Sequence, residues 1–194
     1  MSRRVGAVVL AAGGGSRFSG PEHKLLAAFR GRPVVAWAVE AAVGAGLDRT
    51  AVVTGAADLA GAAGDEVVVI ENEDWADGQA TSLAAAIAWA DAEGLEAVVV
   101  GLGDQPLVRP ETWRAVADAV GAVGERVRPI VVATYGGRRG NPVGLDRAVW
   151  PLLPTTGDEG ARIVMRQRPD LVAELPCDGE AVDIDTWEDL RRWS

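Results

Sequence analysis

Short runs of apolar, mostly β-branched residues alternate along this chain with longer segments of helical periodicity, and this alternation limits the possible folds. The expected strands are Val5 to Leu10, Ala51 to Thr54, Val67 to Ile70, Ala97 to Leu102, Pro129 to Ala133 and Leu171 to Leu175. The expected helices are Pro33 to Ala45, Thr81 to Ala92, Pro110 to Val120, Asp158 to Gln167 and Thr186 to Trp193. The alternation predicts an α/β fold: a doubly wound, mostly parallel sheet in a three-layer, Rossmann-like arrangement.

The chain has 194 residues and no linker-like tract, so we expect one domain over residues 1–194. Cys177 is the only cysteine and His23 the only histidine, which excludes an intrachain disulfide and the common zinc sites. No apolar run approaches the roughly 18 residues of a membrane span, and no signal-like segment precedes Val5. We therefore expect a cytoplasmic protein without a membrane partner.

The formal charge of −9 argues against nonspecific nucleic-acid binding, which needs a basic face. A polyphosphate ligand would need a local cluster of positive charge, such as an arginine, a lysine and a bound divalent cation at one loop. In open α/β sheets, ligands bind beyond the carboxyl ends of the strands. The loops after Leu10, Ile70, Leu102 and Ala133 should therefore form the binding edge.

A glycine-rich loop follows the first expected strand, with the sequence Leu-Ala-Ala-Gly-Gly-Gly-Ser-Arg over residues 10–17. Its small residues would let backbone N–H groups approach phosphate oxygens, while Arg17 and Lys24 supply positive charge. A dinucleotide-binding fingerprint would need glycine where Phe18 stands, and no P-loop ending is present. A glycine turn without a ligand is the alternative.

The segments Leu-Ala-Ala-Gly, Ser16-Arg17-Phe18 and Lys24-Leu25-Leu26 resemble the signature of the MobA-like NTP transferases, which act on sugar phosphates and molybdopterin. This resemblance implies a GT-A-like nucleotidyltransferase fold whose loop wraps a triphosphate, with Arg17 and Lys24 as catalytic charges. The implied nucleotide-binding residues are Leu10, Ala11, Ala12, Gly13, Gly14, Gly15, Ser16, Arg17, Lys24, Gly78, Ser82 and Gly103. Ser82 has the alternative role of a helix-start residue.

Asp104 follows the strand Ala97 to Leu102 within Gly-Asp-Gln-Pro, at the expected binding edge. A carboxylate there is placed to hold Mg²⁺, which takes one or two protein carboxylates and completes its shell with water and phosphate. Asp104 has the alternative role of an acidic turn residue. The segment resembles the metal-binding motif of the molybdenum-cofactor branch, so we expect Asp104 to be a catalytic metal ligand.

Near the end of the chain, Asp-Ile-Asp-Thr-Trp-Glu-Asp-Leu resembles a family motif in which proline stands at the position of Trp187. Alternation along this segment would point Asp183 and Asp185 to one side and Ile184 to the other. We expect Asp185 to be the second metal ligand, although it could instead cap the last helix.

Two further segments resemble the molybdenum-cofactor branch: residues 135–142, ending in Gly-Asn-Pro, and Gly-Asp-Glu-Gly-Ala-Arg at residues 157–162. The resemblance implies that they bind the acceptor, a pterin with a terminal phosphate. The candidate acceptor residues are Arg139, Gly140, Pro142, Asp158 and Arg162. Either arginine could engage the phosphate or lie solvated at the surface.

The implied reaction is Mg²⁺-dependent transfer of CMP from CTP to molybdopterin phosphate with release of pyrophosphate, the product passing to a molybdoenzyme. Ala12 favours CTP, because Leu-Ala-Gly-Gly accompanies GTP in the family. Three alternatives stay open: a guanylyltransferase on the same pterin, a sugar-1-phosphate nucleotidyltransferase, and a non-catalytic carrier of molybdenum cofactor. The long gap between Arg17 and Lys24 favours the sugar enzyme.

Overall fold

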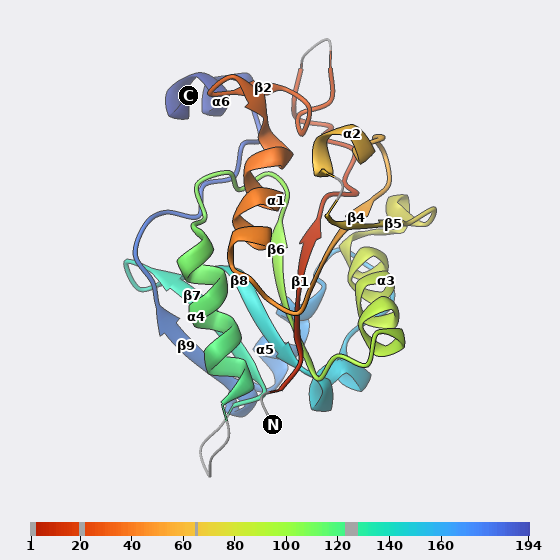
Figure 1. Ribbon diagram of the computed structural model, residues 1–194, viewed down its shortest axis with the longest axis vertical. Helices are drawn as coiled ribbons and strands as arrows, with labels where there is room; N and C mark the ends of the chain where they lie inside the picture. Colours follow the sequence, from red (N-terminus) through yellow and green to blue (C-terminus); the bar gives the residue numbers. More distant parts are fainter. Residues whose placement is uncertain (1–2, 20–21, 65, 123–127) are drawn as a thin grey trace.

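A seven-stranded sheet forms the centre of the computed structural model, which describes residues 3–19, 22–64, 66–122 and 128–194 (Figure 1). The strand order is β5-β4-β1-β6-β8-β7-β9. The strands are β1 Val5–Leu10, β4 Arg49–Thr54, β5 Val68–Glu71, β6 Ala97–Leu102, β7 Ile130–Tyr135, β8 Arg138–Asp146 and β9 Val172–Pro176. Strand β8 is antiparallel to β6 and β7, and the remaining neighbours pair in parallel.

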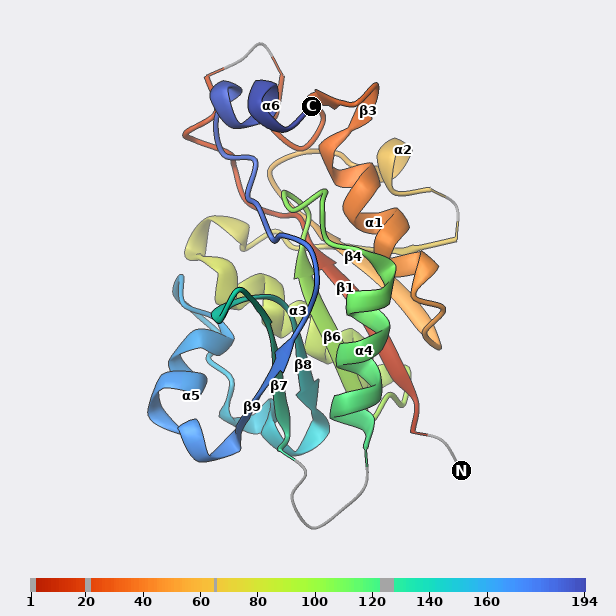
Figure 2. The same ribbon diagram turned by 90° about the vertical axis from the view of Figure 1, so that its left-hand side faces the viewer.

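Helices cover both faces of this sheet (Figure 2). Helices α1 Val34–Gly44 and α4 Pro110–Gly121 lie on one face, and α3 Gln79–Ala92 and α5 Ala161–Gln167 lie on the other. Helix α6 Trp187–Trp193 lies beyond the carboxyl ends of β1 and β6. Short elements complete the fold: β2 Ala28–Phe29, β3 Arg32–Pro33, α2 Ala60–Ala63, η1 Trp75–Asp77, η2 Arg147–Leu152 and η3 Pro169–Leu171. The predicted three-layer, mostly parallel α/β architecture is confirmed.

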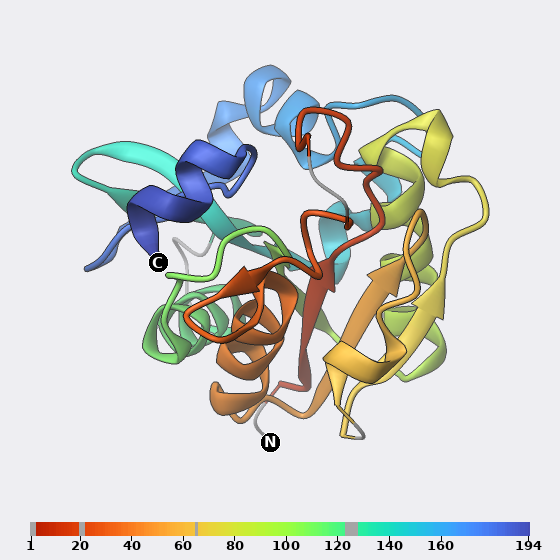
Figure 3. The same cartoon turned by 90° about the horizontal axis from the view of Figure 1, so that it is seen from above.

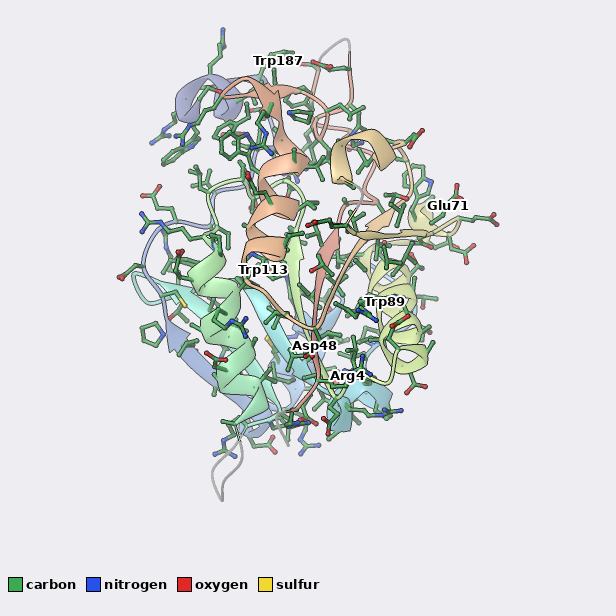
Figure 4. All side chains as sticks on the ribbon, viewed as in Figure 1. Arg4, Asp48, Glu71, Trp89, Trp113 and Trp187 are labelled. Carbon is green, nitrogen blue, oxygen red and sulfur yellow. The ribbon has the colours of Figure 1, made fainter. Side chains whose placement is uncertain are left out.

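Strand β1 lies between β4 and β6, and every one of its residues is buried, as its continuous apolar run predicts. Helix α4 packs closely on β6 at Gly101, where any Cβ would overlap the indole of Trp113 (Figure 4). The parallel pairing of β1 with β6 places the loop after β6, which carries Asp104, beside the loop after β1.

The segment Tyr135 to Pro142 was expected to be a loop, and this expectation is wrong. Residues 138–146 form β8, which pairs with β7 through a tight hairpin. Gly136 and Gly137 have φ of 56° and 78°, the left-handed conformations that a two-residue hairpin turn requires. The Gly-Gly pair was the signal for this hairpin.

The helix expected from Asp158 begins later, at Ala161, and Asp158 does not cap it. Gly160 stands at the N-cap with φ of 50°, so the chain turns sharply before the helix can start. At the last helix, Thr186 is the N-cap and forms a capping box with Asp189. Asp185 is therefore not the cap of α6.

In the part of the chain that the structure describes, every helix is too short or too polar to cross a membrane.

Candidate active site

Two adjoining cavities open at the carboxyl ends of β1 and β6, the edge of the sheet that Figure 3 views from above. The loop cavity, about 440 Å³, is lined by residues 10–17 and by the start of α3. The sheet cavity, about 630 Å³, has its floor on β6, β7 and β8 and is flanked by α5. The two cavities share Leu10, Arg17, Lys24, Gln79, Leu102, Asp104 and Asp185. Ligands in the two cavities would meet at these side chains.

The glycine-rich loop lines its cavity with small residues from Ala11 to Ser16. The Ala11 N–H donates to the Val53 carbonyl at 2.8 Å, which ties the start of the loop to the end of β4. Gly15 has φ of 61°, a conformation that favours glycine. A Cβ on Gly14 would lie 3.1 Å from the Trp75 ring, so the indole packs closely over the loop.

His23 supports this loop from within the protein. Its Nε2–H donates to the Gly13 carbonyl at 3.0 Å, and its Nδ1 accepts the Leu25 N–H at 3.3 Å. Burial lowers the pKa of His23 below its ordinary value of 6.5, although the bond to Gly13 acts in the opposite direction. At neutral pH the ring is therefore uncharged, and it braces the loop.

Lys24 joins two carboxylates at the shared boundary of the cavities. Its Nζ donates to Asp104 Oδ2 at 2.6 Å and to Asp185 Oδ1 at 3.0 Å. Burial disfavours the charge on Lys24, but Asp104 and Asp185 outweigh burial and raise its pKa. Arg17 pairs with the second of these carboxylates, Asp185, and its exposed guanidinium lies 3.0 Å from Asp185 Oδ2.

A third carboxylate, Asp183, lies next to this group and accepts a hydrogen bond from Gln105 Nε2 at 2.8 Å. Burial raises the pKa of Asp183, and the negative charge of Asp104 adds to the effect. Ile184, between Asp183 and Asp185, is fully buried and donates its N–H to the Asp104 carbonyl at 2.9 Å. The alternation expected for this segment is confirmed, since both aspartates line the sheet cavity.

The loop cavity is closed on its far side by the start of α3 and residues 157–158. Gly78 has φ of 108°, and a Cβ there would lie 2.5 Å from the Gly157 carbonyl carbon. The Ala80 N–H donates to the Gly157 carbonyl at 2.8 Å. Only glycine allows these two segments to approach so closely, and their contact brings Asp158 to the loop cavity.

The sheet cavity combines an apolar floor with a charged rim. Its floor is formed by Leu83, Val100, Leu102, Val132, Val143, Leu145 and Met165. On the rim, Arg139 pairs with Glu174 at 2.8 Å, and Arg166 bonds to both carboxylate oxygens of Glu159 at 2.7 Å. Arg162 lies on the same rim. Such a cavity suits a ligand with a flat apolar body and an anionic group.

Residues 7–174 match the MobA-like NTP transferase domain. The chain belongs to the MobA-like NTP transferase family. It is 34% identical over 199 residues to nicotine blue oxidoreductase of Paenarthrobacter nicotinovorans, covering 95% of this chain and 94% of that protein.

Solved structures of similar proteins agree with this membership. The crystal structure of Rv0371c from Mycobacterium tuberculosis H37Rv has a TM-score of 0.82 and 31% identity, covering 99% of this chain and 98% of that one. A second structure of Rv0371c, with a TM-score of 0.77, is a complex with manganese. A nucleotidyl transferase from Methanothermobacter has a TM-score of 0.80 and 26% identity, covering 97% of this chain and 95% of that one. The protein is a nucleotidyltransferase of the MobA-like family.

Most of the sequence-predicted site residues of this MobA-like chain line one of the two cavities. All expected nucleotide-binding residues except Gly103 line the loop cavity. Gly103 instead packs beneath the loop, where a Cβ would lie 3.0 Å from the Ala11 Cβ. Arg139, Gly140 and Arg162 line the sheet cavity, as expected for acceptor residues.

Two predicted acceptor residues lie elsewhere. Asp158 lines the loop cavity, because Gly78 lets residues 157–158 pack against the start of α3. Pro142 lines neither cavity and follows a cis peptide bond within β8. Ser82 does line the loop cavity, and its hydroxyl also accepts a hydrogen bond from Asn72 at 3.0 Å.

The family implies a divalent cation, and the carboxylates of this site fit one. Asp104 Oδ1 is buried and has no hydrogen-bond partner among the described residues. Asp104 and Asp185 lie close enough to share the ammonium group of Lys24. The two carboxylates are therefore close enough to contribute oxygens to one metal cation. The described residues hold no cluster of three or more acidic, histidine or cysteine ligands. A two-carboxylate site is the set that Mg²⁺ or Mn²⁺ accepts when phosphate and water complete its shell.

The candidate site residues taken from the sequence omitted several that the structure brings to the cavities, among them Trp75 in the loop cavity, Arg166 in the sheet cavity and Gln79 in both. Gln79 was adjacent to the predicted Gly78, which was a usable signal. Arg166 follows Arg162 by one helical turn, so the two share a face of α5. Trp75 lies in residues 72–83, a segment that resembles the family's Asn, Trp, Gly and Ser-Leu pattern, but its packing over Gly14 is a long-range contact that this pattern does not reveal.

Proposed function

We propose that this protein transfers CMP from CTP to the terminal phosphate of molybdopterin or molybdenum cofactor, releasing pyrophosphate in the cytoplasm. The observation that carries the proposal is the junction of the two cavities. Arg17, Lys24, Asp104 and Asp185 line both of them. A triphosphate in the loop cavity and a phosphate acceptor in the sheet cavity would therefore meet at one charged boundary.

The loop cavity supports a nucleotide as its ligand. Residues 11–16 line it with mostly small side chains, and Lys24 and Arg17 supply the positive charge that a triphosphate needs. Ala12 stands in the Leu-Ala-Ala-Gly start that accompanies cytidylyl transfer in the resembled family. These features favour CTP.

The sheet cavity supports an aromatic, phosphate-bearing acceptor. Its apolar floor suits a ring system, and Arg162 and Arg139 on its rim suit a phosphate. Arg139 is exposed and paired with Glu174, so a phosphate would compete with that carboxylate for the guanidinium. A molybdopterin-type acceptor has the required combination of ring and phosphate.

The transfer requires no activated serine, cysteine or histidine. An oxygen of the acceptor phosphate attacks the α-phosphorus of CTP, and the bond from that phosphorus to the bridging oxygen breaks. The electron pair leaves with pyrophosphate. Since a phosphate monoester has a second pKa near 6, the attacking oxygen is already ionised at neutral pH. The protein contributes alignment and positive charge, which dominate catalysis of this kind.

Mg²⁺ held by Asp104 and Asp185 would neutralise charge on the phosphates. Asp183 is the alternative second ligand, since it lies two residues away on the same side of the chain. Lys24 lies between Asp104 and Asp185 and is within reach of the same phosphates. It would balance negative charge wherever the phosphates and the carboxylates come together.

The test is release of pyrophosphate from CTP, GTP, ATP and UTP, each with molybdenum-loaded pterin and with or without Mg²⁺. The proposal expects metal-dependent release with CTP. A preference for GTP would identify the guanylyltransferase instead. Release only with sugar 1-phosphates would identify a sugar-nucleotide enzyme, and pterin binding without any release would identify a carrier.

The oxidoreductase named among the relatives, 34% identical to this chain, adds one arm to the test. Nicotine blue and a reduced nicotinamide cofactor would be incubated with the protein, and oxidation of the cofactor followed by absorbance. Asp104→Asn serves as the discriminating variant, because it should abolish metal-dependent nucleotidyl transfer. One outcome would contradict the proposed transfer: the wild type releases no pyrophosphate, and Asp104→Asn still oxidises the cofactor. The protein would then be an oxidoreductase instead of a nucleotidyltransferase.

A further inference from the structure

An aromatic pair joins the two ends of the chain beside the active site. The rings of Phe18 and Trp187 are stacked, with centroids 5.0 Å apart and an interplanar angle of 28°. Phe18 is buried and directly follows Arg17, whereas Trp187 begins α6 (Figure 4). The pair therefore links the end of the glycine-rich loop to the segment that carries Asp183 and Asp185.

Trp187 is held in place independently of this contact. Thr186 caps α6 and accepts the Asp189 N–H at 3.1 Å, while Asp189 accepts the Thr186 N–H at 2.9 Å. Leu190, one turn further along α6, is buried in the core and anchors the helix there. Trp187 thus stands at the first helical position on a fixed support, and its ring can fix the position of Phe18.

Arg17 is weakly restrained by its own contacts. Its side chain is 75% exposed, and its guanidinium pairs with Asp185 at 3.0 Å. An ion pair this exposed is screened by solvent and restrains a long side chain little. The backbone of Arg17 must therefore be placed by its neighbours, of which Phe18 is buried and stacked on Trp187 whereas Ser16 is exposed.

We infer that Trp187 is a positioning residue for triphosphate binding: by stacking on Phe18 it holds Arg17 at the boundary of the two cavities. This inference rests on the proposed function, in which Arg17 binds the triphosphate. Trp187 occupies a position where the resembled family has proline, so the stack is a feature of this chain.

The test removes the ring while preserving the helix. Proline is well tolerated at the first helical position, and Thr186 already has the extended backbone that a following proline requires, so Trp187→Pro should keep α6. Trp187→Phe retains a stacking ring and is the matched control. Binding of inorganic tripolyphosphate with Mg²⁺ is measured by calorimetry, and trypsin cleavage after Arg17 is followed by mass spectrometry.

We expect Trp187→Pro to weaken tripolyphosphate binding about two- to tenfold, the range that loss of an aromatic pair allows, and to accelerate cleavage after Arg17. Trp187→Phe should stay near the wild type in both measurements. In an Arg17→Met background, Trp187→Pro should cause no further loss of binding, because the two residues act through one contact.

Unchanged binding in Trp187→Pro, or an additive loss in the Arg17→Met background, would overturn the inference. Phe18→Leu tests the stack from its other side, and it should reproduce the loss if Trp187→Pro proves unfolded by circular dichroism. If wild-type protein binds no tripolyphosphate, the proposed triphosphate site fails together with the positioning role. Normal binding in every variant refutes the positioning role and leaves the proposed function intact.

Discussion

At the scale of single residues, the site is a balance of opposite charges in a partly enclosed space. Lys24 and Arg17 face Asp104 and Asp185 across distances of 2.6 to 3.0 Å. For the mostly enclosed pair of Lys24 and Asp104, the attraction is worth about 4 kcal/mol before desolvation is subtracted, whereas solvent screens most of the attraction between the exposed Arg17 and Asp185. Exchanging one partner should therefore change the affinity for metal and phosphate more than the stability of the fold.

Asp104→Asn should reduce metal-dependent pyrophosphate release at least about 100-fold, because the amide is a poor ligand for a hard cation. The pKa of Lys24, which Asp104 raises, should fall as well. Release is measured at saturating Mg²⁺ and CTP. Asp91→Asn is the matched control, since Asp91 pairs with Arg147 at the surface. Near-normal release by Asp104→Asn would remove Asp104 from the proposed metal site.

Tyr135 offers a direct test of burial beside the sheet cavity, because it is the only tyrosine in the chain. Burial raises its pKa to about 12, and its hydroxyl donates to the Asn141 carbonyl at 2.7 Å. Because its pKa is higher in the folded than in the unfolded protein, Tyr135 stabilises the fold fully below its unfolded pKa, near 10. This stabilisation is lost as the pH rises through the folded pKa. Absorbance at 295 nm should show a midpoint near 12 in folded protein and near 10 in denaturant. A folded midpoint near 10 would contradict the burial.

At the scale of elements, close backbone contacts determine where functional segments lie. The start of α3 and residues 157–158 touch only because Gly78 lacks a side chain. The hairpin between β7 and β8 depends on Gly136 and Gly137 for a different reason, since both residues have a positive φ while nothing crowds their Cα atoms. Glycine therefore shapes the two walls that enclose the cavities.

Gly78→Ala should destabilise the protein by at least about 3 kcal/mol, since strain at φ of 108° adds to an overlap with Gly157. Gly31→Ala is the matched control. Gly31 has φ of 80°, but nothing lies within 4 Å of its added Cβ, so only about 1 to 2 kcal/mol is expected. Urea unfolding measures both free energies. Equal losses would show that the overlap is relieved by movement of residues 157–158.

At the scale of the whole molecule, the site closes where distant parts of the chain meet. The glycine-rich loop, the loop after β6 and the segment before α6 converge at the carboxyl ends of the parallel strands. A ligand that bridges them binds only the folded chain, so it should stabilise the entire fold.

Mg²⁺ with CTP should therefore raise the unfolding temperature even without an acceptor. At a ligand concentration of 100 times Kd, mass action adds about 2.7 kcal/mol to the free energy of unfolding. The shift is measured by differential scanning calorimetry, with Asp104→Asn as a variant that should lose it. A shift of equal size with Mg²⁺ alone would mean that the nucleotide contributes nothing.

Local sequence patterns determined much of this protein. The apolar runs marked β1 and β6 at their correct ends, and the glycine-rich loop and Asp104 of Gly-Asp-Gln-Pro line the loop cavity at the carboxyl edge of the sheet. These predictions succeeded because strand burial, helix periodicity and glycine tolerance act over a few neighbouring residues.

Only the tertiary structure decided which distant residues meet. The antiparallel insertion of β8, the ammonium group of Lys24 between Asp104 and Asp185, the place of Asp158 in the loop cavity and the stack of Trp187 on Phe18 are all contacts between remote positions. Their formation depends on how the sheet orders its strands and on which side chains then face each other. A one-dimensional pattern cannot encode that choice, because the free energy of such contacts exists only once the chain has brought both partners together.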